Sequence, residues 1–210
     1  MAAIRTTPAT SDAPSELATV RKSQARGRRS ARKLLDTAAV LFLEKGVDAT
    51  TVDDIVLQAG TAKGTFYHHY ESKGALLDAL REQMTDDFAK RIDAALEKCP
   101  PDDLPLVLDT WVEAAFEAYL GMDPLHEVVF GRISTRWSAG DEPFLQNLAA
   151  LLAKGHARGI WHVENPHLTA TFIFRGMLGA VDDLLLSGTP PATAFHGIAD
   201  LARKAIARRP

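Results

Sequence analysis

The chain has 210 residues, of which 46% are hydrophobic and 24% are charged, and its formal net charge is −3. This composition excludes a disulfide miniprotein and a disordered chain, and it describes one or two globular domains with a sizeable core. The single cysteine, Cys99, allows no internal disulfide and fits a reducing compartment. Residues 1–16 contain no apolar run typical of a signal peptide, and no apolar stretch approaches the ~18 residues of a membrane span. We therefore expect a cytoplasmic protein with no membrane partner.

The charges are distributed unevenly along the chain. Residues 1–74 contain 11 Lys and Arg against 8 Asp and Glu, whereas residues 75–210 contain 13 against 19. A basic first part and an acidic second part indicate two different tasks.

The first residues are predicted to form a flexible basic arm over positions 1–29, which continues into the start of a basic helix. The arm is rich in Pro, Thr, Ser and Ala. Its basic run consists of Arg21, Lys22, Arg26, Arg28, Arg29, Arg32 and Lys33. Such an arm is either a solubilising tail or, beside a DNA-binding element, a segment that neutralises phosphates or enters a minor groove.

Three helices are predicted next, over about residues 30–45, 52–59 and 62–70. Apolar residues recur at helical spacing in the first two. Thr51 is a suitable N-cap for the second, and Gly60 provides a turn before the third. Short helices joined by a glycine turn are typical of a helix-turn-helix, whose last helix fits the major groove of DNA.

Gly64 lies inside the predicted third helix, where glycine costs roughly 1 kcal/mol relative to alanine. Either this glycine permits close approach of the backbone to a partner, or it permits helix packing within the domain. Ser72 is then predicted to cap a fourth helix over about residues 73–98.

The same residues resemble the N-terminal domain of the TetR family of bacterial transcriptional regulators. The resemblance covers about residues 30–80 and is specific in its combined spacing; beyond it, the likeness is one of architecture. It is carried by Leu34 to Phe42, Lys45-Gly46, Thr50 to Ile55, Ala59-Gly60, Lys63 to Tyr70 and Ser72-Lys73.

The resemblance implies roles for individual side chains of the helix-turn-helix. Base edges are read from Ala62, Lys63 and Thr65. Phosphates are contacted by Thr51, Tyr67, His68 and Lys73. Phe66 matches a core position. The chain departs from the family pattern at Thr61-Ala62, where an apolar residue and a polar cap are usual. We expect Thr61 to cap the third helix instead.

The remaining chain is predicted to be helical throughout, which makes the fold all-α with about nine helices. No alternating strand pattern occurs. The domains are predicted to be a DNA-binding domain over residues 30–74 and a ligand-binding and dimerisation domain over residues 75–210. The further helices are expected at about 102–120, 124–137, 143–159, 166–186 and 192–208.

The segment 172–186 is apolar on nearly all faces, so it must be buried on several sides. It is either monomer core or a dimer interface, and we favour the interface. The resemblance implies a homodimer through the last two helices. Arg175 in this segment is expected to pair with Asp182 or Asp183, the alternative being contact with an anionic ligand.

Aromatic side chains in the second half could line an apolar ligand cavity, although such a stripe is more often simple core. The candidates are Trp111, Phe116, Tyr119, Phe130, Trp137, Phe172, Arg175 and Met177. The histidines form no HxxxH pair or Cys/His cluster, so no metal site and no cofactor are expected. No catalytic motif or phosphate-binding glycine loop is found either, and we do not expect an enzyme.

These observations predict a DNA-binding transcriptional regulator. The resemblance implies a homodimeric repressor of a palindromic operator, released by a small-molecule effector that enters the C-terminal cavity and shifts the fourth helix. The alternatives are a transcriptional activator and a DNA-organising protein without an inducer. The sequence identifies neither the operator nor the effector.

Overall fold

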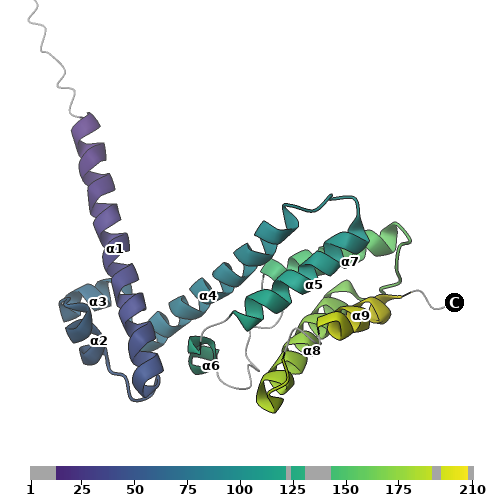
Figure 1. Ribbon diagram of the computed structural model, residues 1–210. Coiled ribbons are helices and arrows are strands. Elements are labelled where there is room, and N and C mark those ends of the chain that lie inside the picture. Colours follow the sequence, from purple (N-terminus) through teal and green to yellow (C-terminus); the bar gives the residue numbers. More distant parts are fainter. Residues whose placement is uncertain (1–12, 122–123, 131–142, 191–194, 208–210) are drawn as a thin grey trace, which may run out of the picture. The chain divides into compact units, whose positions relative to one another are not determined.

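The computed structural model describes residues 13–121, 124–130, 143–190 and 195–207, and all regular structure within these ranges is helical (Figure 1). This confirms the predicted all-α fold. The helices are α1 Ala13–Lys45, α2 Val52–Ala59, α3 Lys63–His69, α4 Lys73–Leu96, α5 Leu104–Leu120, α6 Leu125–Phe130, α7 Pro143–Ala157, α8 Pro166–Ser187 and α9 Phe195–Ile206.

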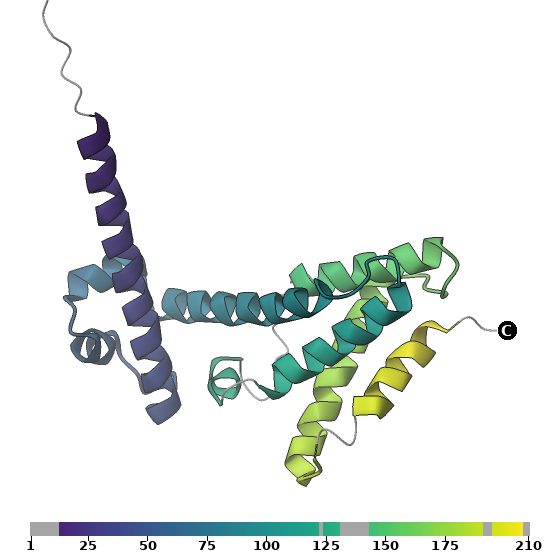
Figure 2. The ribbon, with the colours of Figure 1, turned by 45° about the horizontal axis from the view of Figure 1, so that its top comes forward.

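Helix α1 begins much earlier than the sequence suggested. It starts at Ala13 rather than near Ser30, and its N-terminal part continues as a straight helix past α2 and α3 (Figure 2). Residues 13–29 are mostly good helix formers, with Pro14 in the first turn, where proline is well tolerated. Residues 13–29, which we predicted to belong to a flexible arm, lie within this helix, and the basic residues from Arg21 onward therefore belong to α1.

The chain divides into two compact units, Met1–Asp78 and Ala79–Pro210, and the division falls within α4. In the first unit, α1, α2 and α3 pack against one another in pairs. Their buried side chains recur at helical spacing: Leu34, Ala38, Leu41 and Phe42 from α1, Ile55, Val56 and Ala59 from α2, and Phe66 from α3. This core fixes α3 relative to the other two helices.

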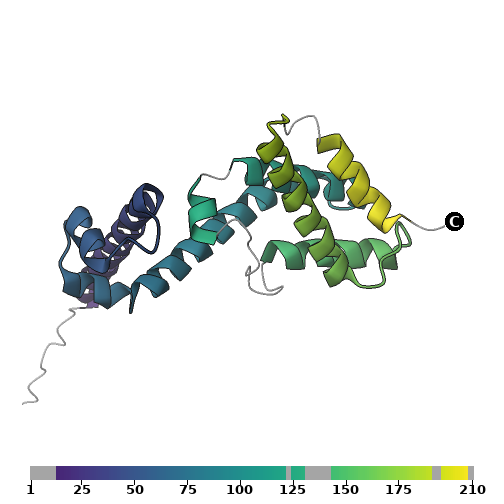
Figure 3. The same ribbon diagram turned by 90° about the horizontal axis from the view of Figure 1, so that it is seen from below.

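In the second unit, α5 packs against α7, α8 and α9, and α8 crosses α7 with α9 beside it (Figure 3). An aromatic cluster fills the centre of the unit. Phe174 of α8 lies 4.9 Å from Phe144 and 5.8 Å from Phe88 between ring centroids, and 6.3 Å from Trp111. Edge-on and tilted ring pairs of this kind are the usual packing of buried aromatic residues.

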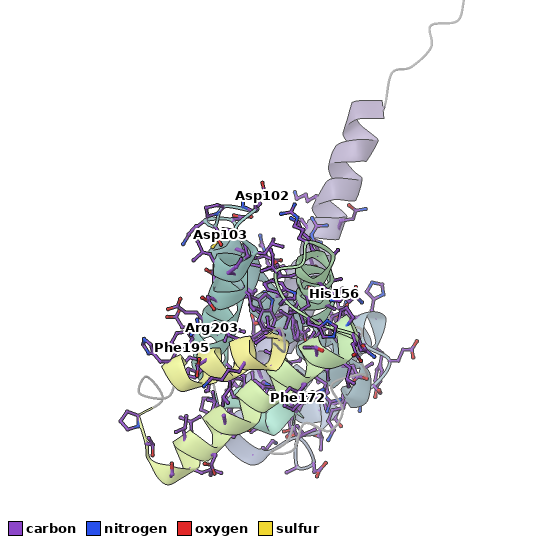
Figure 4. The ribbon with its side chains drawn as sticks, turned by 90° about the vertical axis from the view of Figure 1, so that its right-hand side faces the viewer. Asp102, Asp103, His156, Phe172, Phe195 and Arg203 are labelled. Carbon is purple, nitrogen blue, oxygen red and sulfur yellow. The ribbon has the colours of Figure 1, made fainter. Side chains whose placement is uncertain are left out.

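Helix α9 is held by polar contacts near its C-terminal end. Arg203, labelled with Phe195 in Figure 4, forms an ion pair with Asp109 of α5 at 2.9 Å. The His162 amide donates to the Ile206 carbonyl at 3.0 Å. These contacts connect α9 to α5 and to the segment that precedes α8.

Candidate nucleic-acid interface

Helix α2 is closed at both ends as predicted. The Thr51 hydroxyl accepts from the Asp54 amide, and the Asp54 carboxylate accepts from the Thr51 amide at 2.8 Å, which completes a reciprocal capping box. At the other end Gly60 adopts a left-handed conformation with φ of 59°, which glycine tolerates without steric cost. The turn that leads to α3 is therefore specified locally by Thr51 and Gly60.

The start of α3 differs from the expectation. Its N-cap is Ala62, which provides no side-chain hydrogen bond. The prediction that Thr61 caps the helix is wrong: its hydroxyl is buried and has no hydrogen-bond partner among the described residues. Thr61 precedes the N-cap by one residue, whereas a capping side chain must belong to the N-cap residue to reach the first free amides.

Helix α3 presents several polar side chains outward from one buried anchor. Phe66 is fully buried and packs its ring against Tyr70 at 5.9 Å and against Tyr67 at 5.4 Å. Among the residues that the sequence assigned to DNA contacts here, Ala62, Lys63, Tyr67 and His68 are exposed, and Thr65 is half-buried. The structure thus brings these five side chains together on a short helix whose orientation is fixed by packing.

Lys63 has an acidic partner on α2. Its ammonium lies 2.7 Å from the Asp53 carboxylate, and both side chains are largely exposed. This hydrogen bond raises the pKa of Lys63, which is charged at neutral pH in any case. Since an exposed ion pair contributes little to stability, Lys63 can exchange this partner for another at small cost.

Thr51 and Lys73, two of the predicted phosphate contacts, have internal partners. The Thr51 hydroxyl donates its hydrogen to Asp54 at 2.7 Å. The Lys73 ammonium donates to the carbonyls of Val47 at 2.6 Å, Thr50 at 2.8 Å and Asp48 at 3.3 Å. All three hydrogens of this ammonium group therefore have acceptors. Through these bonds Lys73 connects the start of α4 to the loop after α1.

A groove of about 360 Å³ lies between α1 and α3. Its lining residues are Arg26, Gly27, Ser30, Gly64, Thr65, His68 and His69. Ser30 and His69 meet across it, with 2.7 Å between the hydroxyl oxygen and the ring Nε2. Burial lowers the pKa of His69, and neighbouring His68 lowers it further. Sequence reasoning missed this groove because Arg26 and Ser30 reach α3 only if α1 is helical upstream of residue 30.

The ligand-pocket candidates of the second unit occupy different environments. Trp111, Phe116 and Met177 are buried, whereas Tyr119, Phe130 and Arg175 are half-buried. Trp137 lies outside the described residues. Phe172 was predicted to line a cavity, but 68% of it is exposed on the outer face of α8 (Figure 4). Ile173 and Phe174 occupy the inner face instead.

Two polar groups mark the interior of this unit. The indole N–H of Trp111 is buried and has no hydrogen-bond partner among the described residues. The Tyr119 hydroxyl donates to Asp182 at 2.6 Å, and the Tyr119 ring meets that of His126 edge-on. Burial lowers the pKa of His126. Asp182 was one of the two predicted partners of Arg175. Its hydrogen bond to Tyr119 connects α8 to α5.

The described residues contain neither a metal-binding cluster nor a membrane-spanning helix. No group of three or more His, Cys, Asp or Glu side chains in these ranges is arranged to hold a metal ion. No helix in these ranges is both long enough and apolar enough to span a membrane.

Comparison with known sequences gives matches at the N-terminal part. Residues 34–80 match the family described as bacterial regulatory proteins, tetR family. The HTH-type transcriptional repressor KstR2 of Rhodococcus jostii is 48% identical over 62 residues, which are 30% of this chain and 29% of that protein. The uncharacterized HTH-type transcriptional regulator YvdT of Bacillus subtilis is 37% identical over 84 residues, 40% of this chain and 42% of that protein. The matched segments thus cover less than half of these relatives.

Solved structures match over most of the chain. A tetR family transcription regulator from Shewanella sp. PV-4 has a TM-score of 0.69 at 24% identity and covers 86% of this chain and 99% of its own. FadR from Bacillus subtilis, solved in complex with stearoyl-CoA, has a TM-score of 0.65 at 19% identity, with 83% and 98% covered. At these identities the likeness establishes the fold of both units.

Proposed function

Because residues 34–80 match the family of bacterial regulatory proteins described as tetR family, we propose that this chain is a sequence-specific DNA-binding transcriptional regulator. The observation that carries the proposal is helix α3, anchored by the fully buried Phe66 and presenting Lys63, Tyr67 and His68 outward. A helix held rigidly in this way can enter the major groove with its N-terminal residues at the base edges.

The side chains of α3 divide into two groups by their position. Ala62, Lys63 and Thr65 belong to the first turn and read bases. To read a base, Lys63 must leave Asp53. Its ammonium group then donates to the acceptors of guanine. Tyr67 and His68 lie further along the helix and contact phosphates, which position the protein without reading sequence.

Thr51 and Lys73 are also assigned to phosphates, with a condition that their internal hydrogen bonds impose. A phosphate oxygen must displace a loop carbonyl to gain a full hydrogen bond from Lys73, whose three hydrogens already have acceptors. Their contribution to DNA affinity is therefore smaller than that of Tyr67 and His68.

The regulator acts as a homodimer on a palindromic operator. Support comes from an outward stripe on α8 that includes Leu168, Phe172 and Leu186, which are 63%, 68% and 82% exposed. Gly176 and Gly179 lie between them, and a Cβ at either would meet no described atom within 4 Å. Leu201 of α9 is 66% exposed. Two copies joined through α8 and α9 would cover these side chains, and each would read one half-site.

A small-molecule effector of the second unit controls DNA binding. The buried Trp111 N–H, without an acceptor among the described residues, supports a ligand that brings an oxygen acceptor. Arg81 of α4 donates to the Val129 carbonyl of α6 at 3.1 Å, so a ligand that moves α6 would also shift α4. FadR from Bacillus subtilis was solved with stearoyl-CoA.

Repression is the favoured outcome of DNA binding, because KstR2 and its equivalents are named as repressors. A transcriptional activator would use the same DNA-binding unit, and a DNA-organising protein would need no effector. The relatives are regulators, and we assign this chain no catalytic activity. The protein would act in the cytoplasm, where bacterial DNA is found.

The test is fluorescence anisotropy of the purified protein on DNA from upstream of its own gene and on a random duplex of equal length. A regulator that controls its own gene should prefer the upstream duplex by roughly 10³-fold or more at physiological salt. Equal binding to both duplexes with a steep salt dependence would favour the DNA-organising alternative.

A further inference from the structure

The groove between α1 and α3 includes Thr65 and His68, which the proposed function uses, but its α1 wall has no role in that proposal. One wall is formed by α1 at Arg26, Gly27 and Ser30, and the other by α3 from Gly64 to His69. The lining residues include an arginine, two histidines and two hydroxyl groups, but no Asp or Glu. The chemistry of the lining therefore suits an anion.

Basic side chains of α1 extend away from the groove along the same face. Lys22, Arg26 and Lys33 are exposed and follow one another at intervals of four and seven residues, which place them on one side of a helix. The Lys33 ammonium lies 3.9 Å from the position of a Cβ on Gly60, and thus beside the turn before α3. The cationic face of α1 therefore extends to the turn between α2 and α3.

A hydrogen-bond chain holds the groove in shape. The Ser30 hydroxyl donates its single hydrogen to the Gly27 carbonyl at 2.9 Å. The Ser30 hydroxyl also lies 2.7 Å from the Nε2 of His69, and this hydrogen bond joins α1 to α3. Tyr70 adds a second link by donating to the Ala31 carbonyl at 3.3 Å.

The two glycines of the groove leave room for an approaching group. A Cβ at Gly64 would meet no described atom within 4 Å, so the packing of this unit does not demand a glycine there. A Cβ at Gly27 would only touch the His69 ring, at 4.0 Å. A glycine inside a helix without a packing reason is typical of close backbone approach to a ligand.

We propose that this groove binds a phosphodiester group of the operator DNA, with Arg26 as the principal cation and His68 as a second donor. Ser30 and His69 are positioning residues that hold α1 beside α3. The helical start of α1 thereby becomes part of the DNA interface. This inference rests on the proposed DNA-binding function, which it extends to a second helix.

The experiment compares Arg26→Gln with Arg32→Gln in the full chain. Both variants remove one positive charge from α1, but Arg32 lies outside the groove and is held by Asp36 at 2.9 Å. Operator affinity is measured by anisotropy across a series of salt concentrations, and circular dichroism monitors the fold. Each phosphate contact contributes about 0.9 to the slope of log affinity against log salt. We expect Arg26→Gln to lower the slope by about that amount and Arg32→Gln to leave it unchanged.

The outcomes separate this inference from the proposed function. Equal slopes for the two variants, with a wild-type protein that binds its operator, overturn the groove assignment alone. A wild-type protein without operator affinity overturns both. Binding of inorganic phosphate at constant ionic strength is a second measurement. If Arg26→Gln abolished phosphate binding but left the salt slope of DNA binding unchanged, the groove would be a site for a free anion, and the DNA assignment would be refuted.

Discussion

At the scale of single residues, Lys63 and Tyr67 share the exposed face of α3 but have different predicted partners. Lys63→Ala should relax base preference at one operator position by ~1–3 kcal/mol. Tyr67→Phe removes a hydroxyl that contacts a phosphate, so it should weaken binding to all sequences alike. Competition binding against single-base operator variants measures both effects. A uniform loss of affinity for Lys63→Ala would refute its base-reading role.

Gly64 offers a test in which stability and function change in opposite directions. Gly64→Ala should stabilise α3 by up to roughly 1 kcal/mol, because alanine is the better helix former and the added methyl has open space. The same methyl should weaken DNA binding by obstructing the backbone approach to α3. Thermal unfolding and anisotropy on one preparation check both parts. Unchanged operator affinity would show that nothing approaches this position.

At the scale of helical elements, the cap of α2 predicts an acid-sensitive unit. The Asp54 carboxylate accepts from the Thr51 amide and hydroxyl and lies 2.7 Å from the Lys45 ammonium. The Lys45 contact first, then the Thr51 bonds, hold the pKa of Asp54 well below its ordinary value. A carboxyl whose pKa is lower in the folded state stabilises above its unfolded pKa, and this stabilisation disappears as the pH falls through the folded pKa.

The variant Asp54→Asn should therefore unfold at a lower temperature than wild type at neutral pH, and the difference should shrink as the pH falls below the ordinary pKa of aspartate. Melting curves between neutral and strongly acidic pH measure this. Asp53→Asn is the matched control, because Asp53 accepts no capping hydrogen bond and its removal should leave the melting temperature nearly unchanged. A difference independent of pH would contradict the cap assignment.

Helix ends were predictable where the signal is local and not where it depends on packing. Thr51 and Gly60 specify their turns through side-chain and backbone geometry, and the structure has both as expected. The predicted cap at Thr61 was wrong, because α3 starts one residue later than expected and its N-cap is Ala62. The early start of α1 depends on many weak helix preferences, which no single residue reveals.

At the scale of the whole molecule, the exposed stripe of α8 predicts the dimer. Phe172→Glu places a charge within this stripe and should raise the dimer dissociation constant by about thirtyfold or more, as expected for a hot spot of ~2 kcal/mol. Operator affinity should fall with it. The monomer should stay folded, because most of the Phe172 side chain is exposed. Analytical ultracentrifugation measures the assembly.

The control for this prediction is Leu106→Glu, which adds the same charge at an exposed leucine of α5. It should leave the assembly unchanged. A Phe172→Glu variant that dimerises as tightly as wild type would contradict the proposed interface.

The candidate sites were predictable to different degrees. Residues of α3 follow a specific motif, and the five predicted contacts lie on or at the start of one short helix, four of them exposed and Thr65 half-buried. The groove with Arg26 was not predictable, because it needs α1 and α3 to meet across 39 residues of sequence. Phe172 was assigned to the interior since apolar content does not reveal which face of a helix has a neighbour.

The central claim is that α3 gives this chain sequence specificity, and selection from a pool of random duplexes tests it most directly. The purified full chain is used to enrich bound duplexes over several rounds, and the enriched pool is sequenced. We predict a palindromic motif whose half-sites lie about 34–36 Å apart, or a multiple of that distance, as a two-fold dimer requires. A pool that binds tightly but contains no shared motif would contradict the claim.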